Sequence, residues 1–168
     1  MSKAPLKTTP ETYLAMSKQD RRFLLIGALC AQFSHLEFRL AQVIWSLLGI
    51  NEKTGKLVTS GLDILPRVRM AIRLASHLNA KSAVKKALDK VRTELQNGII
   101  DQRNLAVHGI HTVSDDGETM TLEVHRGGNA NRQITISIRD LNALNKRIYD
   151  LSTYLDREVP DLSSIIAK

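Results

Sequence analysis

The sequence contains very few cysteine and aromatic residues. Cysteine occurs once, at Cys30, so no internal disulfide can form, and a lone Cys in an apolar helical run is typical of a reducing compartment. Aromatic residues make up only 4% of the 168 residues, so the core must consist mostly of Leu, Ile, Val and Ala. This composition favours helix-on-helix packing over a β-sandwich. We therefore expect a mainly α, cytoplasmic protein.

Long uninterrupted apolar runs are also missing. The segments FLLIGALCAQF and AQVIWSLLGI are separated by His35, Glu37 and Arg39, and each falls short of the ~20 apolar residues that span a membrane. The first twenty residues are polar and contain two prolines, so they lack the apolar region of a signal peptide. We expect no membrane partner.

The sequence patterns of metal centres and nucleotide-binding loops do not occur either. The His residues and Cys30 lack zinc-ligand spacing: His108 and His111 are three residues apart but flank Gly109, and no carboxylate cluster accompanies them. There is no P-loop, no G-x-G-x-x-G and no G-x-S-x-G elbow. We therefore expect neither a metal nor a cofactor.

Positive charge is abundant. The chain carries 24 Lys and Arg against 17 Asp and Glu, a net charge of +7 that makes an anionic partner such as nucleic acid plausible and that also serves solubility. Residues 61–94 hold eight of these basic residues against three acids. Arg69 and Arg73 share one helix face, as do Lys81 and Lys85. Such a surface is either simply solvated or a nucleic-acid-binding track along which phosphates bind.

The length suggests one domain, residues 20–160, preceded by a flexible N-terminal arm over residues 1–19. Apolar spacing predicts a first helix over residues 20–48, which Gly49 ends and in which Phe33 and Trp45 are core or interface anchors. The segment NEKTGK, residues 51–56, is interpreted as a polar loop.

Two further helices are predicted before the helical spacing of apolar residues ends at about residue 110. The second spans about 61–78, and the third runs from Ser82, its expected N-cap, to Gly109, its expected left-handed C-cap. We expect the third helix to be continuous. A turn that splits it at Asn97-Gly98 is the alternative.

The stretch from about 110 to 138 is typical of a small antiparallel β-hairpin or meander. The segments MTLEVH and QITISI alternate and are rich in β-branched residues, and Asp116-Gly117 and Gly127-Gly128 are turn signals. Ser137 and Asp140 then form a capping-box pattern for a last helix to about Leu155, which Pro160 ends. The predicted fold is a mainly α bundle of about four helices with a small β insertion between helices three and four.

The segment DQRNLAVHG, Asp101 to Gly109, places polar residues at the end of the third helix. At ~100° per residue, Asp101, Asn104 and His108 lie on one stripe, whereas Arg103 lies ~140° away from His108. The two side chains can meet only if the Arg stem wraps around the helix, the helix end frays, or a second chain supplies the partner. An Arg on a solvated face, with a His that caps carbonyl groups, is the simpler explanation.

The spacing Arg103-Asn104-x-x-x-His108 resembles the R-x4-6-H motif of the HEPN family (higher eukaryote and prokaryote nucleotide-binding domains), in which a polar residue often follows the Arg. The resemblance implies a HEPN-like helical bundle, a metal-independent ribonuclease that is often a toxin or defence effector, and a homodimer whose two motifs face each other. It also implies RNA as a partner and an antitoxin or regulatory protein as another. The alternatives are a non-enzymatic HEPN-like interaction module and a basic nucleic-acid-binding protein in which the spacing is a coincidence.

The residue types suit cleavage of RNA by its own 2′-oxygen, which needs acid–base catalysis and stabilisation of the phosphorane. We assign acid–base catalysis to His108, because imidazole titrates near neutral pH, and charge stabilisation to Arg103. We expect Asn104 to orient His108 or a phosphate oxygen, and Asp101 to support His108. Glu37, a carboxylate in an apolar helical stripe, is either exposed or paired along its helix, or it turns inward and positions Arg103.

Overall fold

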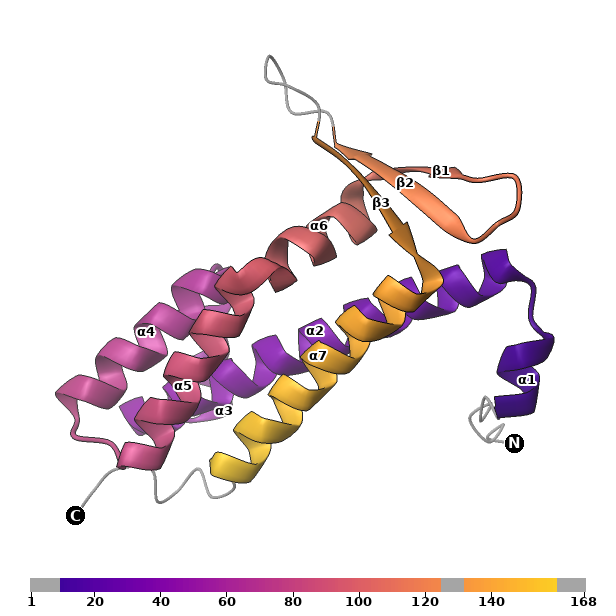
Figure 1. Ribbon diagram of the computed structural model, residues 1–168. Coiled ribbons are helices and arrows are strands. Elements are labelled where there is room, and N and C mark those ends of the chain that lie inside the picture. Colours follow the sequence, from indigo (N-terminus) through magenta and orange to yellow (C-terminus); the bar gives the residue numbers. More distant parts are fainter. Residues whose placement is uncertain (1–9, 125–131, 160–168) are drawn as a thin grey trace.

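The computed structural model describes residues 10–124 and 132–159. This part of the chain is mainly helical and carries one small antiparallel sheet, which confirms the predicted mainly α class with a small β insertion, although the described helices are more numerous than the four or so predicted (Figure 1). The turn expected at Gly127-Gly128 and the helix end expected at Pro160 lie outside the described residues. The elements in chain order are α1 (Pro10–Ala15), α2 (Lys18–Leu48), α3 (Glu52–Thr59), α4 (Ile64–His77), α5 (Ser82–Glu94), a π-helical turn η1 (Leu95–Ile99), α6 (Ile100–His108), β1 (Ile110–Val113), β2 (Thr119–Val124), β3 (Arg132–Ser137) and α7 (Ile138–Glu158).

The long helix α2 is the centre of the bundle. Its inward-facing residues recur at helical spacing, and Leu29, Leu36 and Leu40 are fully buried. α7 packs along α2 more extensively than any other element does, and α4 and α5 contribute to the same core. Phe33 and Trp45 are 4% and 7% exposed, so both are core residues. The predicted first helix and last helix are confirmed.

One described helix, α2, is long and apolar enough to cross a membrane by length and composition alone. The core helix of a soluble protein passes the same test, and here α2 contacts α3, α4, α6 and α7. This property therefore does not place the chain in a membrane, and its location in the cytoplasm stays a prediction.

A short helix, α3, occupies the segment interpreted as a polar loop. Asn51 caps it, because its side-chain oxygen accepts a hydrogen bond from the backbone N–H of Thr54 at 3.0 Å. Gly55 lies so close to Trp45 that an added Cβ would come within 3.0 Å of the indole ring. The loop prediction was wrong because this glycine allows two helices to pack closely and does not make a turn.

The third predicted helix is not continuous. Ser82, the expected N-cap, is the first residue of α5, and Lys81 occupies the N-cap position. Within η1, Asn97 and Gly98 leave helical geometry, and Gly98 has a left-handed φ of +95°. The chain therefore bends between α5 and α6, and the alternative of a break at Asn97-Gly98 is correct. The bend sets the direction of α6, which carries the R-x4-H motif.

The three strands form the predicted meander, in the order β1-β2-β3 with both pairs antiparallel. The turn between β1 and β2 has Gly117 at a φ of +69°, a conformation that favours glycine. Met120 and Leu122 of β2 are buried in the common core. Arg22 of α2, itself buried, donates hydrogen bonds to the carbonyl oxygens of Gly117 and Thr119. The sheet is thus fixed to α2 as well as to α6 and α7.

α6, which precedes the sheet, ends at a specific contact. α7, which follows the sheet, begins at another. Gly109 follows α6 with φ −74° and ψ 154°, so the predicted left-handed cap was wrong. A Cβ at Gly109 would come within 3.0 Å of the carbonyl oxygen of Leu105, in the last turn of α6. α7 begins with the predicted capping box: Ser137 Oγ accepts from the N–H of Asp140 at 3.1 Å, and Asp140 accepts from the N–H of Ser137 at 2.8 Å.

Residues 10–19, expected to belong to a flexible arm, include α1 and the start of α2. Ser17 caps α2 through its side chain. Arg21 donates hydrogen bonds to the carbonyl oxygens of Leu14 at 2.7 Å and Met16 at 3.1 Å. These bonds tie α1 to the start of α2, so the ordered structure begins earlier than predicted.

Candidate active site

The candidate site lies at the C-terminal end of α6, where the chain leaves the bundle and enters β1 (Figure 1). Leu105 and Ala106 are buried, and α6 packs against α2 and β2. Nη1 of Arg103 lies 3.3 Å from Nε2 of His108 in the same chain. α6 stays helical through His108, so the Arg side chain reaches around the helix. The contact therefore needs neither a frayed helix nor a second chain.

Asn104 and Phe33 hold the guanidinium of Arg103 in place. Asn104 Oδ1 accepts a hydrogen bond from Nη1 of Arg103 at 3.0 Å, so Asn104 orients the Arg and not His108 directly. Cζ of Arg103 lies 4.7 Å from the centroid of the Phe33 ring, a cation–π contact that contributes about 0.5–2 kcal/mol depending on desolvation. Nε of Arg103 is buried and has no hydrogen-bond partner among the described residues. Phe33 contributes to the site although no pattern in the sequence indicates it.

The contact brings a hydrogen-bond donor to a ring nitrogen that can accept. A guanidinium only donates hydrogen bonds, so Nη1 of Arg103 donates to Nε2 of His108 when the ring proton lies on Nδ1. His108 is exposed, whereas Arg103 is half-buried beside it. The end of α6 therefore presents an imidazole, a group suited to acid–base catalysis, next to a fixed positive charge that can bind an anion.

Glu37 does not position Arg103. Both residues are described, and no ion pair joins them; Phe33, one turn before Glu37 on α2, contacts the guanidinium instead. Glu37 is half-buried, and its backbone carbonyl oxygen accepts a hydrogen bond from Arg67 at 3.1 Å. Asp101 is exposed in the first turn of α6, two turns before His108. Its support of His108 stays a prediction.

The basic residues of α4 and α5 lie away from the motif. Arg69 and Arg73 are exposed on α4, which packs on α2 and α5, and Lys81 and Lys85 lie at the start of α5. Figure 1 shows α5 and α6 running on from one another, with His108 at the far end. At ~1.5 Å per residue, Lys85 and His108 are at most about 35 Å apart, and the bend at Gly98 shortens this distance. The basic residues at the start of α5 therefore lie at the end of that helix that is remote from α6.

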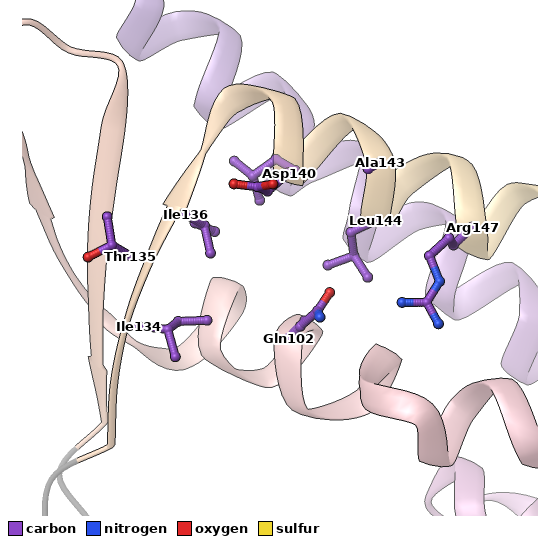
Figure 2. A pocket seen from close by; sticks show the side chains of 9 residues that line it. Gln102, Ile134, Thr135, Ile136, Asp140, Ala143, Leu144 and Arg147 are labelled. Carbon is purple, nitrogen blue, oxygen red and sulfur yellow. The ribbon is translucent and has the colours of Figure 1, made fainter.

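A cavity of about 430 Å³ opens between α6, β3 and α7 (Figure 2). Gln102, Ile134 and Leu144 point into it, and neither Arg103 nor His108 lines it. Arg147 at its edge is paired with Glu94 at 3.1 Å. The cavity is therefore separate from the R-x4-H motif.

The described residues include no group of three or more His, Cys, Asp or Glu that could hold a metal ion. Nε2 of His111, the nearest other imidazole in sequence, lies 3.1 Å from the carbonyl oxygen of Ala106 and so caps α6. No family model, curated protein or solved structure matches the chain. The function must therefore be argued from the contact between Arg103 and His108.

Proposed function

We propose that this protein is a HEPN-like, metal-independent endoribonuclease that acts in the cytoplasm as a homodimer. The observation that carries the proposal is the 3.3 Å contact between Arg103 and His108 at an exposed helix end, because it combines an anion-binding charge with an acid–base group. The mainly helical fold, with the motif at the end of a late helix, agrees with the resemblance to HEPN domains. The net charge of +7 suits RNA as the partner. A toxin or defence role, held in check by an antitoxin or regulatory protein, is part of the same proposal.

The proposed reaction begins when an RNA phosphate binds Arg103. The guanidinium donates to two phosphate oxygens and releases Nε2 of His108. His108 accepts the proton of the 2′-hydroxyl, the 2′-oxygen attacks phosphorus, and the bond between phosphorus and the 5′-oxygen breaks. The products are a 2′,3′-cyclic phosphate and a 5′-hydroxyl. Asn104 keeps the guanidinium in place while negative charge builds up on the phosphorane.

The leaving 5′-oxygen needs an acid in the same reaction in which the single imidazole of one motif acts as the base for the 2′-hydroxyl. A two-fold dimer supplies a second His108, which can be protonated while the first is not. One imidazole then acts as the base and the other as the acid. This requirement is the chemical reason why the proposal includes a homodimer.

A non-enzymatic HEPN-like module, which pairs with itself or binds nucleic acid, is a second candidate. One observation favours it: Arg103 is half-buried on Phe33, and its Nε is out of contact with solvent, as for an Arg with a structural role. In that case Arg103 and His108 stabilise the end of α6 and do not bind RNA.

Cleavage of varied RNAs in EDTA separates these candidates. We expect Arg103→Ala and His108→Ala to lower the rate by about 100-fold or more, the usual contribution of an acid–base or charge-stabilising group. His77→Ala is the matched control, because His77 is exposed in the last turn of α4, and its activity should equal that of the wild type. A folded wild-type protein that cleaves none of the RNAs would contradict the enzyme and favour the interaction module.

A further inference from the structure

The sequence HGIH at residues 108–111 contains a second histidine that the proposed reaction does not use. Nε2 of His111 lies 3.1 Å from the carbonyl oxygen of Ala106. A carbonyl oxygen only accepts hydrogen bonds, so the imidazole of His111 donates in this contact. The neutral ring with its proton on Nε2 can donate in this way, and so can the charged ring. A side chain of β1 therefore binds back to the last turn of α6, two residues before His108.

The last turn of α6 has few hydrogen bonds to hold it. α6 contains only nine residues, and the last carbonyl groups of a helix have no partner within that helix. The N–H of Gly109 donates to the carbonyl oxygen of Leu105 at 2.9 Å. The next carbonyl group, that of Ala106, is the one that His111 binds. Ala106 is fully buried, so without the imidazole its carbonyl oxygen would lack a partner away from water.

The sheet holds His111 in the position that this contact requires. His111 pairs with Leu122 of β2, and residues directly opposite each other in an antiparallel pair share one face of the sheet. Leu122 is fully buried in the common core, and α6 packs against β2. The half-buried imidazole therefore lies on the face of the sheet that α6 covers. Because Arg22 ties the same sheet to α2, the imidazole is a fixed support for the end of α6.

The position of His108 depends on this turn. His108 is exposed and is the last residue of α6, and among the described residues its ring hydrogen-bonds only with Arg103. Arg103 is held elsewhere, by the ring of Phe33 on α2 and by Asn104 one turn earlier. The 3.3 Å between Nη1 of Arg103 and Nε2 of His108 is already long for a hydrogen bond. If the turn frays, the imidazole moves away from the guanidinium, and a displacement of ~1 Å can lower a rate by about 100-fold.

We propose that His111 is a positioning residue for the ribonuclease reaction. Its hydrogen bond to the carbonyl oxygen of Ala106 holds the last turn of α6, and this turn keeps the imidazole of His108 beside Arg103 and within reach of the 2′-hydroxyl. His111 acts through the backbone of α6 and exchanges no proton with the RNA. The inference rests on the proposed function, because that function gives His108 its place in the reaction. It applies within each copy of the chain and does not depend on how two copies pair.

Steady-state cleavage of RNA in EDTA by His111→Phe and His111→Gln tests this role. Phenylalanine fills a similar space but cannot donate, whereas the amide of glutamine donates from a similar distance along the side chain. We expect kcat of His111→Phe to fall by about 10–100-fold, with KM within about twofold of the wild-type value, because Arg103 still binds the phosphate. His111→Gln should recover kcat to within about threefold of the wild type.

A role in stability alone gives a different result. It would lower the melting temperature of His111→Phe but leave kcat unchanged at a temperature where circular dichroism shows a folded variant. His35→Phe is the matched control, because His35 also has a hydrogen-bond partner, Ser152 Oγ at 3.4 Å, but joins α2 to α7; its kcat should equal that of the wild type. If His111→Phe does not fold, His111→Met takes its place. Wild-type kcat in His111→Phe, or an equally low kcat in His111→Gln, would overturn the inference.

Hydrogen exchange of the Gly109 amide, followed by NMR, tests the same role without RNA. This N–H is bonded to the carbonyl oxygen of Leu105, so its exchange reports how often the last turn of α6 opens. We expect exchange about tenfold or more faster in His111→Phe than in the wild type, and near the wild-type rate in His111→Gln. Equal rates in His111→Phe and the wild type would overturn the inference. Faster exchange in a protein that cleaves no RNA would refute only the ribonuclease, whereas full cleavage by His111→Phe would refute only the positioning role.

Discussion

Replacing Gly55 with alanine should destabilise the protein by about 2 kcal/mol. The new Cβ would come within 3.0 Å of the Trp45 ring, which is 7% exposed and cannot move outward because α3 covers it. Overpacking of this kind costs about 1–3 kcal/mol. Displacing the indole also breaks its hydrogen bond from Nε1 to Thr59 Oγ1, 3.1 Å long, for a further ~1 kcal/mol. The higher helix propensity of alanine offsets about 1 kcal/mol.

The assay is urea unfolding followed by tryptophan fluorescence, because Trp45 is the single tryptophan and reports directly on this contact. Gly61→Ala is the matched control, since Gly61 is exposed and an added Cβ there would meet nothing within 4 Å. Its free energy of unfolding should be unchanged or up to about 1 kcal/mol higher. If Gly55→Ala is as stable as this control, α3 does not pack on α2 as described.

Three further perturbations test the parts that support the site. Phe33→Leu keeps an apolar side chain in the core but removes the cation–π contact of about 1 kcal/mol, so RNA cleavage should fall by about fivefold, and unchanged cleavage would show that Phe33 does not hold Arg103. Gly98→Ala should lower the free energy of unfolding by about 1–2 kcal/mol, because alanine adopts a φ of +95° poorly; equal thermal stability would contradict the bend. The backbone N–H and then the hydroxyl of Ser137 hold the pKa of Asp140 below its ordinary value, so the capping box stabilises the fold fully above about pH 4 and this contribution is lost as the pH falls through the lowered pKa. Acid unfolding of Asp140→Asn should therefore depend less steeply on pH below 4 than that of the wild type, and identical curves would refute this assignment.

Local signals in the sequence predict most of the fold. Apolar spacing defines α2, the alternating β-branched residues define the meander, and Ser137 with Asp140 marks the start of α7. Each of these signals acts between residues that are close in sequence. The glycines were harder to interpret, because the reason for a glycine often lies in a distant segment. Gly55 of α3 contacts Trp45 of α2, and neither residue alone indicates this contact.

The candidate site could be predicted only in part for the same reason. The spacing of Arg103 and His108 identifies the pair and their angular separation, and the structure shows how the Arg side chain closes the gap. The support from Phe33 could not be derived, because it depends on how α6 crosses α2, which the bend at Gly98 determines. Glu37 was the more obvious partner by charge. Burial of the Arg stem against an aromatic ring takes the place of an ion pair here.

The most direct test of the central claim, that Arg103 and His108 cut RNA without a metal, is analysis of the product ends from an RNA cleaved in EDTA. The same RNA with a single 2′-deoxyribose at the cleaved position is the matched substrate. We expect 2′,3′-cyclic phosphate and 5′-hydroxyl ends, with no cleavage at the 2′-deoxy position. Cleavage that persists at the 2′-deoxy position, or that leaves 5′-phosphate ends, would contradict it.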